Sequence, residues 1–433
     1  MGSMGTDQTR PPLHSSIPPL ILGTATFNTQ YVRDPFNENE LPALSIVSRA
    51  LELGVSAFDT SPYYGPSEII LGNALSHPSV ARKHPRPSYF LVAKAGRIAG
   101  DVFDYSPAWI RYSVCRSLER LHTPYLDLVY THDVEFVSPA EVLAAVRELR
   151  RLRDEGVIRY VGISGYPVGK LCELAEMVLR ETGEPLDAVL SYGHFTIQNT
   201  TLEHSAMRRF AEAGVDVVLN ASMLGMGLLT TRGVDRGPMA TWHPSPEGLR
   251  RACQDLVPVA VGAGEKLEVV AIRWALDNWA RAGAAKGAFP KQLPGARVGV
   301  SVMGVASVAE LEETYRVFNS VVEGLAPEDT ADADLAGRRR WSLDRARKIQ
   351  GVVEKMWAVL GRWRNYSWSS PEPGYVNARK NTEMGTVPED AIAKKYGLKG
   401  ADFGERQGAE LEVKMPMFPA LSAYKFAKSS SSA

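Results

Sequence analysis

Short apolar runs alternate along the chain with longer segments whose apolar residues recur every three or four positions. The apolar runs predict strands at 20–27, 56–64, 89–96, 126–133, 159–165, 187–195, 215–224 and 298–304. The periodic segments predict helices at 42–54, 67–76, 107–121, 139–156, 168–183, 200–214, 267–283 and 307–321, with Gly156 and Gly183 as stops. Eight repeats of strand then helix favour a (β/α)8 TIM barrel over an open doubly wound sheet.

The rest of the chain divides around this repeat. We expect 1–18 to be a flexible segment and 19–325 to form the barrel. Residues 326–370 carry apolar positions at helical spacing, so we expect a helical extension packed on the barrel, with Trp363 and Trp368 as core contacts. From 371 to 433 sustained periodicity is missing, which is typical of a mostly disordered tail.

Composition excludes several classes of function. The formal net charge is zero, so nothing suggests a nucleic acid or an anionic membrane as partner. Cys115, Cys172 and Cys253 are scattered without metal-ligand spacing, so we expect a reducing, cytoplasmic location and no bound metal. No apolar stretch is long enough for a bilayer span, and the myristoylation pattern at Gly2 and Thr6 lacks a basic patch. We expect a monomer, because no extra apolar helix face is evident.

Four residues with acid–base chemistry stand where predicted strands end. Asp59 and Tyr64 follow the second strand, Lys94 lies in the third, and His132 ends the fourth. In a parallel barrel, strand ends of the same sense open onto one face, where chemistry is found. A phenol is too weak an acid for fast proton transfer at neutral pH, and a nearby ammonium lowers its pKa.

These residue types predict roles. Tyr64 would exchange a proton with a carbonyl or hydroxyl oxygen, with Lys94 lowering its pKa and Asp59 holding Lys94 in place. His132 would bind the substrate oxygen. Such chemistry is half of a carbonyl–alcohol redox reaction, and the other half needs a hydride carrier, so a nicotinamide is implied. Tyr63 is adjacent to Tyr64, but the spacing from Asp59 favours Tyr64.

The chain resembles the aldo-keto reductase superfamily, whose pattern is an Asp, a Tyr five residues later followed by Gly, then a Lys and a His at the next two strand ends. Here these are Asp59, Tyr64 with Gly65, Lys94 and His132. The other matching segments are 21–27, 156–167, 221–229 and 302–315. The resemblance implies a (β/α)8 barrel that binds a nicotinamide dinucleotide in extended form, without a Rossmann domain.

The resemblance also implies cofactor contacts at matching positions. These are Thr24, Asp59, Ser164, Ser222, Leu224, Gly227, Gly304, Ala306 and Glu313. Gly165 replaces the second residue of a Ser/Asn–Asn pair, and Met223 replaces a proline. The aromatic ring that often stacks on the nicotinamide would fall at Ala221, and Tyr192 is a candidate substitute. We interpret the Gly- and Pro-rich stretch 230–246 as a flap over the dinucleotide.

The same comparison predicts which dinucleotide is used. The 2′-phosphate of NADP needs a nearby Arg or Lys, which the family places in the segment that matches 302–314. This chain has neither residue there, and Glu310 stands where an arginine often appears. The absence favours NAD.

Segments 132–136, 162–167, 190–195 and 224–229 most resemble the branch that oxidises the anomeric carbon of a sugar to a lactone with NAD. Tyr64 would then act as general base on the C1 hydroxyl of an aldose, D-arabinose by likeness, with L-galactose or L-fucose as alternatives. Two other functions stay open. One is an NADPH-dependent carbonyl or aldehyde reductase, and the other is a non-catalytic nicotinamide-binding redox-sensor subunit.

Overall fold

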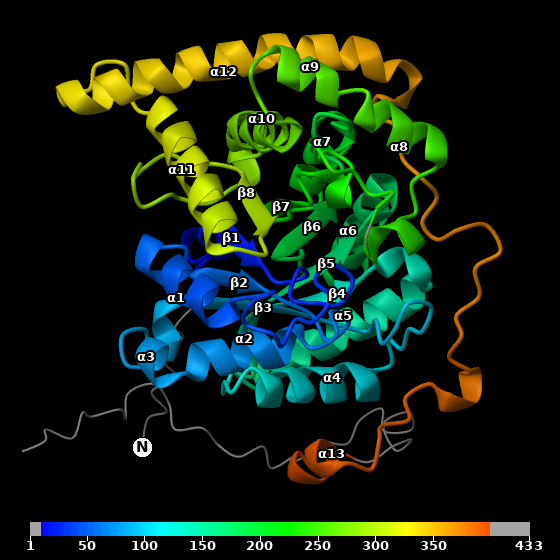
Figure 1. The fold of residues 1–433 in the computed structure, drawn as a ribbon. Coiled ribbons are helices and arrows are strands. Elements are labelled where there is room, and N and C mark those ends of the chain that lie inside the picture. The colour runs from blue at the N-terminus through cyan, green and yellow to red at the C-terminus, as the bar shows by residue number, and fades with distance from the viewer. Residues whose placement is uncertain (1–9, 237, 399–433) are drawn as a thin grey trace, which may run out of the picture.

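Eight parallel strands close into a barrel surrounded by helices (Figure 1). The computed structural model describes residues 10–236 and 238–398. The strands are β1 (Leu20–Gly23), β2 (Ala57–Asp59), β3 (Phe90–Ala95), β4 (Leu126–His132), β5 (Ile158–Gly165), β6 (Ala188–Tyr192), β7 (Val217–Ala221) and β8 (Val300–Gly304). Each strand pairs in parallel with the next along the chain, and β8 pairs with β1. The predicted (β/α)8 TIM barrel is confirmed.

The helices follow the strands in the predicted order. They are α1 (Ala43–Leu53), α2 (Ser67–Ser76), α3 (Pro78–Ala81), α4 (Pro107–Arg120), α5 (Pro139–Asp154), α6 (Val168–Thr182), α7 (Thr201–Glu212), α8 (Glu247–Gln254), α9 (Val257–Gly262), α10 (Leu267–Ala282), α11 (Val308–Gly324), α12 (Ala333–Leu360) and α13 (Ala391–Lys395). The short helices α3 after α2, α8 and α9 after β7, and α13 after α12 are additional. Among the described residues, no helix is long and apolar enough to cross a membrane.

Local sequence signals set the helix ends. Ser138 precedes α5 and accepts a hydrogen bond from the Glu141 N–H at 3.3 Å, while the Glu141 carboxylate accepts from the Ser138 N–H at 2.8 Å. Gly54 and Gly183 end α1 and α6 in the left-handed conformation. These caps fix where each helix turns back toward the next strand.

Alternate residues of each strand point into the barrel. Ile21, Leu128, Leu219 and Val302 belong to this inner core. Because side chains on a strand alternate with a period of two, the last inward positions follow from these. They are Gly23, Asp59, Lys94, His132, Ser164, Tyr192, Ala221 and Gly304. The strand register therefore places three of the four predicted catalytic residues on one rim of the barrel.

The N-terminal segment closes the opposite end of the barrel. Leu13 and Ile17 are buried within the inner core, and the Tyr160 hydroxyl donates to the Pro11 carbonyl at 2.8 Å. A flexible segment was expected over 1–18, and this is wrong for residues 10–18, because two apolar side chains anchor them. Residues 1–9 lie outside the described residues. The carboxyl ends of the strands are left as the face for ligands.

The long helix α12 lies across α10 and α11 (Figure 1). Ile349, Val353 and Met356 are buried on its inner side. Arg273 of α10 donates to the Ser342 hydroxyl at 2.8 Å, which ties the two helices together. Trp363, just after α12, is half-buried against α8 at Gly248.

Beyond α12, residues 364–398 form a strap that leads to α13, beside α4 (Figure 1). Trp368 is buried, and Tyr396 and Leu398 join an apolar cluster with Trp109 and Tyr112 of α4. A mostly disordered tail was expected from 371 onward, and over 371–398 this is wrong. The apolar residues there are few and have no helical period, but Val387, Ala393, Tyr396 and Leu398 are buried. Residues 399–433 lie outside the described residues.

Candidate active site

A buried ion pair forms the base of the site. Lys94 donates a hydrogen bond to Asp59 and a second, of 3.1 Å, to the Thr60 carbonyl. The side chains of Lys94 and Asp59 are 2% and 6% exposed, so neither meets much solvent. Burial raises the pKa of Asp59, and the Lys94 ammonium opposes this. Asp59 Oδ2 has no hydrogen-bond partner among the described residues, which leaves one acceptor for a ligand.

Tyr64 and His132 complete the predicted group of four. The Lys94 Nζ lies 4.8 Å from the ring centre of Tyr64, and the ring centres of Tyr64 and His132 lie 5.7 Å apart, edge to face. Tyr64 comes from the loop between β2 and α2, whereas His132 ends β4. The structure therefore brings together all four residues that the sequence singled out.

The charge state of Tyr64 differs from the expectation. Burial raises its pKa well above the usual value, Asp59 and Asp133 act in the same direction, and Arg97 opposes them. Lys94 was expected to lower this pKa. Lys94 is paired with Asp59, whose negative charge acts in the opposite direction and raises the pKa of the phenol. Tyr64 is therefore protonated at neutral pH in the protein alone.

The imidazole of His132 is held in one orientation. The Ser61 hydroxyl accepts from the Tyr63 N–H at 3.1 Å and lies 3.0 Å from His132 Nδ1. Nδ1 is the only acceptor that the Ser61 hydroxyl meets among the described residues, so its proton points to Nδ1 and the imidazole proton resides on Nε2. Burial lowers the pKa of His132 to about 3, so the ring is neutral. Its Nε2–H can donate to a substrate oxygen.

The rim is bare over three neighbouring strands, β7, β8 and β1, and β1 adjoins Asp59 on β2. Its inward positions on β7, β8 and β1 are Ala221, Gly304 and Gly23, and a Cβ on Gly304 would lie 3.1 Å from Thr26 Cγ2. Ser164 is buried on β5, beside His132 in the strand register, and its hydroxyl donates to the Thr131 carbonyl at 3.3 Å. A flat ring fits where side chains are missing, so these residues suit a nicotinamide.

Tyr192 and Thr24 lie on the rim in different ways. Tyr192 is the inward residue that ends β6, and its ring centre is 5.4 Å from that of Tyr166. In the register of β6 and β7 it lies beside Ala221. Position 221 is where the aromatic ring that often stacks on the nicotinamide would fall. Thr24 uses its N–H and hydroxyl to bond the Asp59 carbonyl, at 2.8 and 3.0 Å, so its side chain holds the loops together.

The loop after β7 has an unusual backbone. Ser222 and Gly227 have φ values of 57° and 102°, and Leu224 lies between them. A Cβ on Gly227 would lie 2.8 Å from the Met239 sulfur, so the 230–246 loop packs onto this turn. The proposed flap therefore lies on the catalytic face, as its position after β7 requires.

The loop after β8 holds the remaining predicted contacts. The Ala306 N–H donates to the Glu310 carboxylate at 2.8 Å, and the Glu310 N–H donates to the Ser307 hydroxyl at 3.2 Å. Ser307 thus caps α11, and the Glu310 carboxylate is folded back onto this loop. Glu313 is exposed one turn further along α11.

Sequence reasoning missed three charged residues beside the four. Arg97 donates a hydrogen bond to Asp133, and its guanidinium lies 3.8 Å from the ring centre of Tyr63. Asp133 Oδ2 lies 3.6 Å from His132 Nε2. Glu135 lies two residues further on and is buried. Each of the three follows Lys94 or His132 by at most three positions, and that proximity was the signal available.

The position of Glu135 explains why residue 165 is a glycine here and not the second residue of the family's Ser/Asn–Asn pair. Its Oε1 accepts from the Tyr166 N–H at 3.1 Å and from the Ser370 hydroxyl at 2.9 Å. A Cβ on Gly165 would lie 2.5 Å from the Glu135 Oε2, so a larger residue there requires the carboxylate to shift. Burial raises the pKa of Glu135 to about 8.

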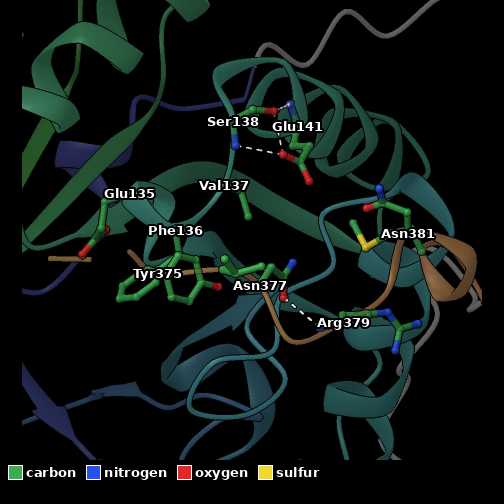
Figure 2. Close-up of a pocket in the computed structure, with 11 residues that line it drawn as sticks. Glu135, Phe136, Val137, Ser138, Glu141, Tyr375, Asn377, Arg379 and Asn381 are labelled. Carbon is green, nitrogen blue, oxygen red and sulfur yellow. Dashed lines mark hydrogen bonds between the residues drawn. The ribbon is translucent and has the colours of Figure 1, made fainter. Parts of the chain in front are cut away.

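A separate groove of about 380 Å³ lies between the loop after β4, the start of α5 and the strap (Figure 2). Phe136 and Tyr375 pack edge to face at one end, with ring centres 5.0 Å apart. None of the four site residues lines this groove. The polar ends of Ser138, Glu141 and Asn377 are already hydrogen-bonded within the protein, so we assign no ligand to it.

The chain is similar in sequence to known proteins of one family. Residues 19–329 match the Aldo/keto reductase family. The chain is 38% identical to D-arabinose 1-dehydrogenase of Saccharomyces cerevisiae over 320 residues, which cover 73% of this chain and 88% of that protein. It is 34% identical to L-galactose dehydrogenase of Arabidopsis thaliana over 278 residues, which cover 62% and 79%.

A solved structure, the glycerol dehydrogenase of Gluconobacter oxydans, matches the fold with a TM-score of 0.50 at 20% identity, covering 82% of this chain and 94% of that one. This likeness concerns the fold alone. The family match, in contrast, spans every strand of the barrel and the four residues gathered on its rim. The chain therefore belongs to the aldo-keto reductase family.

Proposed function

We propose that this protein is an NAD-dependent sugar 1-dehydrogenase that oxidises the anomeric carbon of an aldose to the lactone. D-Arabinose is the proposed substrate, and L-galactose and L-fucose are alternatives. The observation that carries the proposal is the meeting of Tyr64, Lys94 and His132 around one point of a rim that is bare over β7, β8 and β1. The names of the two sugar dehydrogenases among its relatives support the substrate class.

The chain's own residues handle the oxygen and its proton. The His132 Nε2–H donates to the oxygen on C1 and positions it beside the Tyr64 hydroxyl oxygen. Tyr64, as phenolate, takes the proton of the C1 hydroxyl, so that the lactone C=O forms as the O–H bond breaks. The Lys94–Asp59 pair fixes an ammonium near the phenol ring. A nicotinamide, when bound, supplies the acceptor for the hydride that leaves C1.

Several residues would hold that nicotinamide. Ser164 can bond the carboxamide from β5, and Tyr192 can pack against the ring from β6. The turn at Ser222 and Gly227 provides backbone for the pyrophosphate. NAD is favoured over NADP because segment 302–314 has no Lys or Arg and Glu310 adds a negative charge.

The test is a rate panel. The assay offers D-arabinose, L-galactose, L-fucose and D-glucose for oxidation with NAD, and aromatic aldehydes for reduction with NADH and with NADPH. Initial rates are followed by the absorbance of the reduced nicotinamide. The first three sugars should react and D-glucose should be poor, because a mismatched hydroxyl leaves a buried polar group unpaired. Faster reduction of the aldehydes than oxidation of every sugar would contradict the proposal and favour a carbonyl reductase.

A further inference from the structure

An ion pair lies beside the imidazole that binds the reacting oxygen. Arg97, just after β3, donates to Asp133, just after β4, and the Asp133 side chain is 2% exposed. Arg97 is fixed in turn by the Tyr63 ring and by the Gly100 carbonyl, which it reaches at 2.9 Å. The pair is therefore rigid, and the mechanism above makes no use of it.

One carboxylate oxygen of this ion pair has no hydrogen-bond partner among the described residues. Asp133 Oδ2 takes the hydrogen bond from Arg97, whereas Oδ1 has no partner among the described residues. A buried carboxylate oxygen without a donor is costly, and such groups are rare unless a ligand or water completes them. Burial raises the pKa of Asp133, but the charge and hydrogen bond of Arg97 outweigh this and keep it ionised. Oδ1 can only accept a hydrogen bond.

The backbone at Asp133 fixes the position of its carboxylate. Asp133 has a φ of 58°, in the left-handed region that few residue types tolerate. This conformation turns the chain directly after His132 and places Asp133 Oδ2 3.6 Å from His132 Nε2. Oxygens on neighbouring carbons of a sugar are separated by about one hydrogen-bond length. Oδ1 belongs to the same carboxylate as the Oδ2 atom that Arg97 holds, so the carboxylate lies next to the nitrogen that holds O1 and can reach the adjacent oxygen.

We propose that Asp133, clamped by Arg97, accepts a hydrogen bond from the substrate hydroxyl on C2 and so determines specificity. C1 of a cyclic aldose has two neighbouring oxygens besides its own hydroxyl, the ring oxygen and the C2 hydroxyl. The ring oxygen has no proton to donate, so only the C2 hydroxyl can satisfy the carboxylate. The inference rests on the proposed function, and it names the position on the sugar that this chain recognises.

The test compares D-arabinose with 2-deoxy-D-ribose, which is the same sugar without the C2 hydroxyl. The wild-type protein should prefer D-arabinose in kcat/KM by about tenfold to a hundredfold, as expected for a hydrogen bond to a charged group. In Asp133→Gly, which suits the left-handed backbone, the preference should fall to within about threefold. It should fall because D-arabinose loses rate and the deoxy sugar does not. Asp133→Asn keeps a weaker acceptor and should lie between.

Asp127→Asn is the matched control. Asp127 is also a buried aspartate paired with an arginine, Arg86, and it lies at the far end of β4. This variant should lose stability but keep the wild-type preference. NAD affinity, followed by quenching of tryptophan fluorescence, should be unchanged in the Asp133 variants.

Each other outcome is decisive. If Asp133→Gly slows both sugars by the same factor, Asp133 acts through His132 or through folding, and the inference is wrong. It is equally wrong if the wild-type protein oxidises the two sugars alike. If the wild-type protein oxidises neither sugar with NAD, the proposed function itself fails and the inference fails with it.

Discussion

The indole ring of Trp368 stacks on the phenol ring of Tyr166, with 4.4 Å between the ring centres and 14° between the planes. Tyr166 follows β5 directly, two residues after Ser164 on the rim. His243, from the 230–246 loop, contacts the edge of Trp368, with ring centres 5.5 Å apart. Three segments distant in sequence thus meet at the catalytic face, and the strap is part of that face.

The strap should therefore contribute to stability. Ending the chain at Ser370 removes Tyr396 and Leu398 from the apolar cluster on α4, and it removes the two hydrogen bonds of 3.0 and 2.8 Å between Asn377 and the Phe103 backbone. We expect the Tm to fall by roughly 5 °C or more in a thermal melt. A chain that ends at Leu398 keeps all these contacts and should melt like the full chain. Equal melting of the two truncated chains would show that the strap's contacts are not stabilising.

Replacing Tyr64 by Phe should abolish most turnover. The ring and its contact with Lys94 remain, but the proton acceptor is lost, so kcat should fall by about a hundredfold or more. Dinucleotide affinity, measured by fluorescence titration, should hardly change. Tyr63→Phe is the matched control and should keep most activity. If the two variants had exchanged phenotypes, the base would be Tyr63.

Oxidation should accelerate with pH. Burial raises the pKa of Tyr64, so at neutral pH only a small fraction is phenolate. Below the pKa, that fraction grows about tenfold per pH unit, so kcat/KM for sugar oxidation should rise from about pH 6 to about pH 9. Reduction of the lactone or of an aldehyde needs the protonated phenol and should stay level. A flat oxidation profile in steady-state assays would count against Tyr64 as the base.

Glu135 should make folding stability depend on pH. Its carboxyl ionises near its ordinary pKa of 4.5 in the unfolded chain but only near about 8 in the folded protein, because of burial. Between these values the folded state binds more protons, so the stabilising contribution of this group is lost as pH rises. Glu135→Gln cannot ionise. Its free energy of unfolding relative to wild type should increase from about pH 5 to about pH 8 and then level off in urea titrations.

The matched control is Glu38→Gln at an exposed position in the loop before α1, where the difference from wild type should not vary over that range. A constant difference for the Glu135 variant would mean that its carboxyl is not buried in solution.

Glu310 should set part of the preference for NAD. Wild-type protein should use NAD much more efficiently than NADP, and Glu310→Arg should narrow the ratio of the two kcat/KM values by adding a phosphate partner. Glu310→Gln keeps an oxygen for the Ala306 N–H while removing the charge. It therefore separates the effect of charge repulsion on the 2′-phosphate from the effect of losing the hydrogen bond to the Ala306 N–H. The Gln variant should narrow the ratio less than the Arg variant. Equal use of both dinucleotides by the wild-type protein would contradict this assignment.

The barrel and the four residues of the site were accessible from the sequence for a physical reason. Strand and helix periods are local, and in a parallel barrel the residue that ends one strand shares a rim with the residue that ends the next. Asp59, Lys94 and His132 therefore meet without any knowledge of long-range packing. Tyr64 needed only its spacing from Asp59.

The rest depended on contacts that no local pattern contains. Tyr396 and Leu398 lie in a short apolar stretch without a helical period, and their burial becomes evident only with α4 beside them. The pKa of Tyr64 was predicted with the wrong sign. An isolated ammonium would lower it, but the ion pair with Asp59 and the burial of the phenol dominate.

Glu135 and Gly165 constrain how this site can change. A Cβ at position 165, such as that of the asparagine in the family's usual pair, would lie 2.5 Å from a carboxylate oxygen. A larger residue at position 165 displaces the Glu135 carboxylate from its bonds to Tyr166 and Ser370 unless Glu135 changes as well. Any redesign that seeks the second amide contact to a carboxamide should therefore vary residues 135 and 165 together.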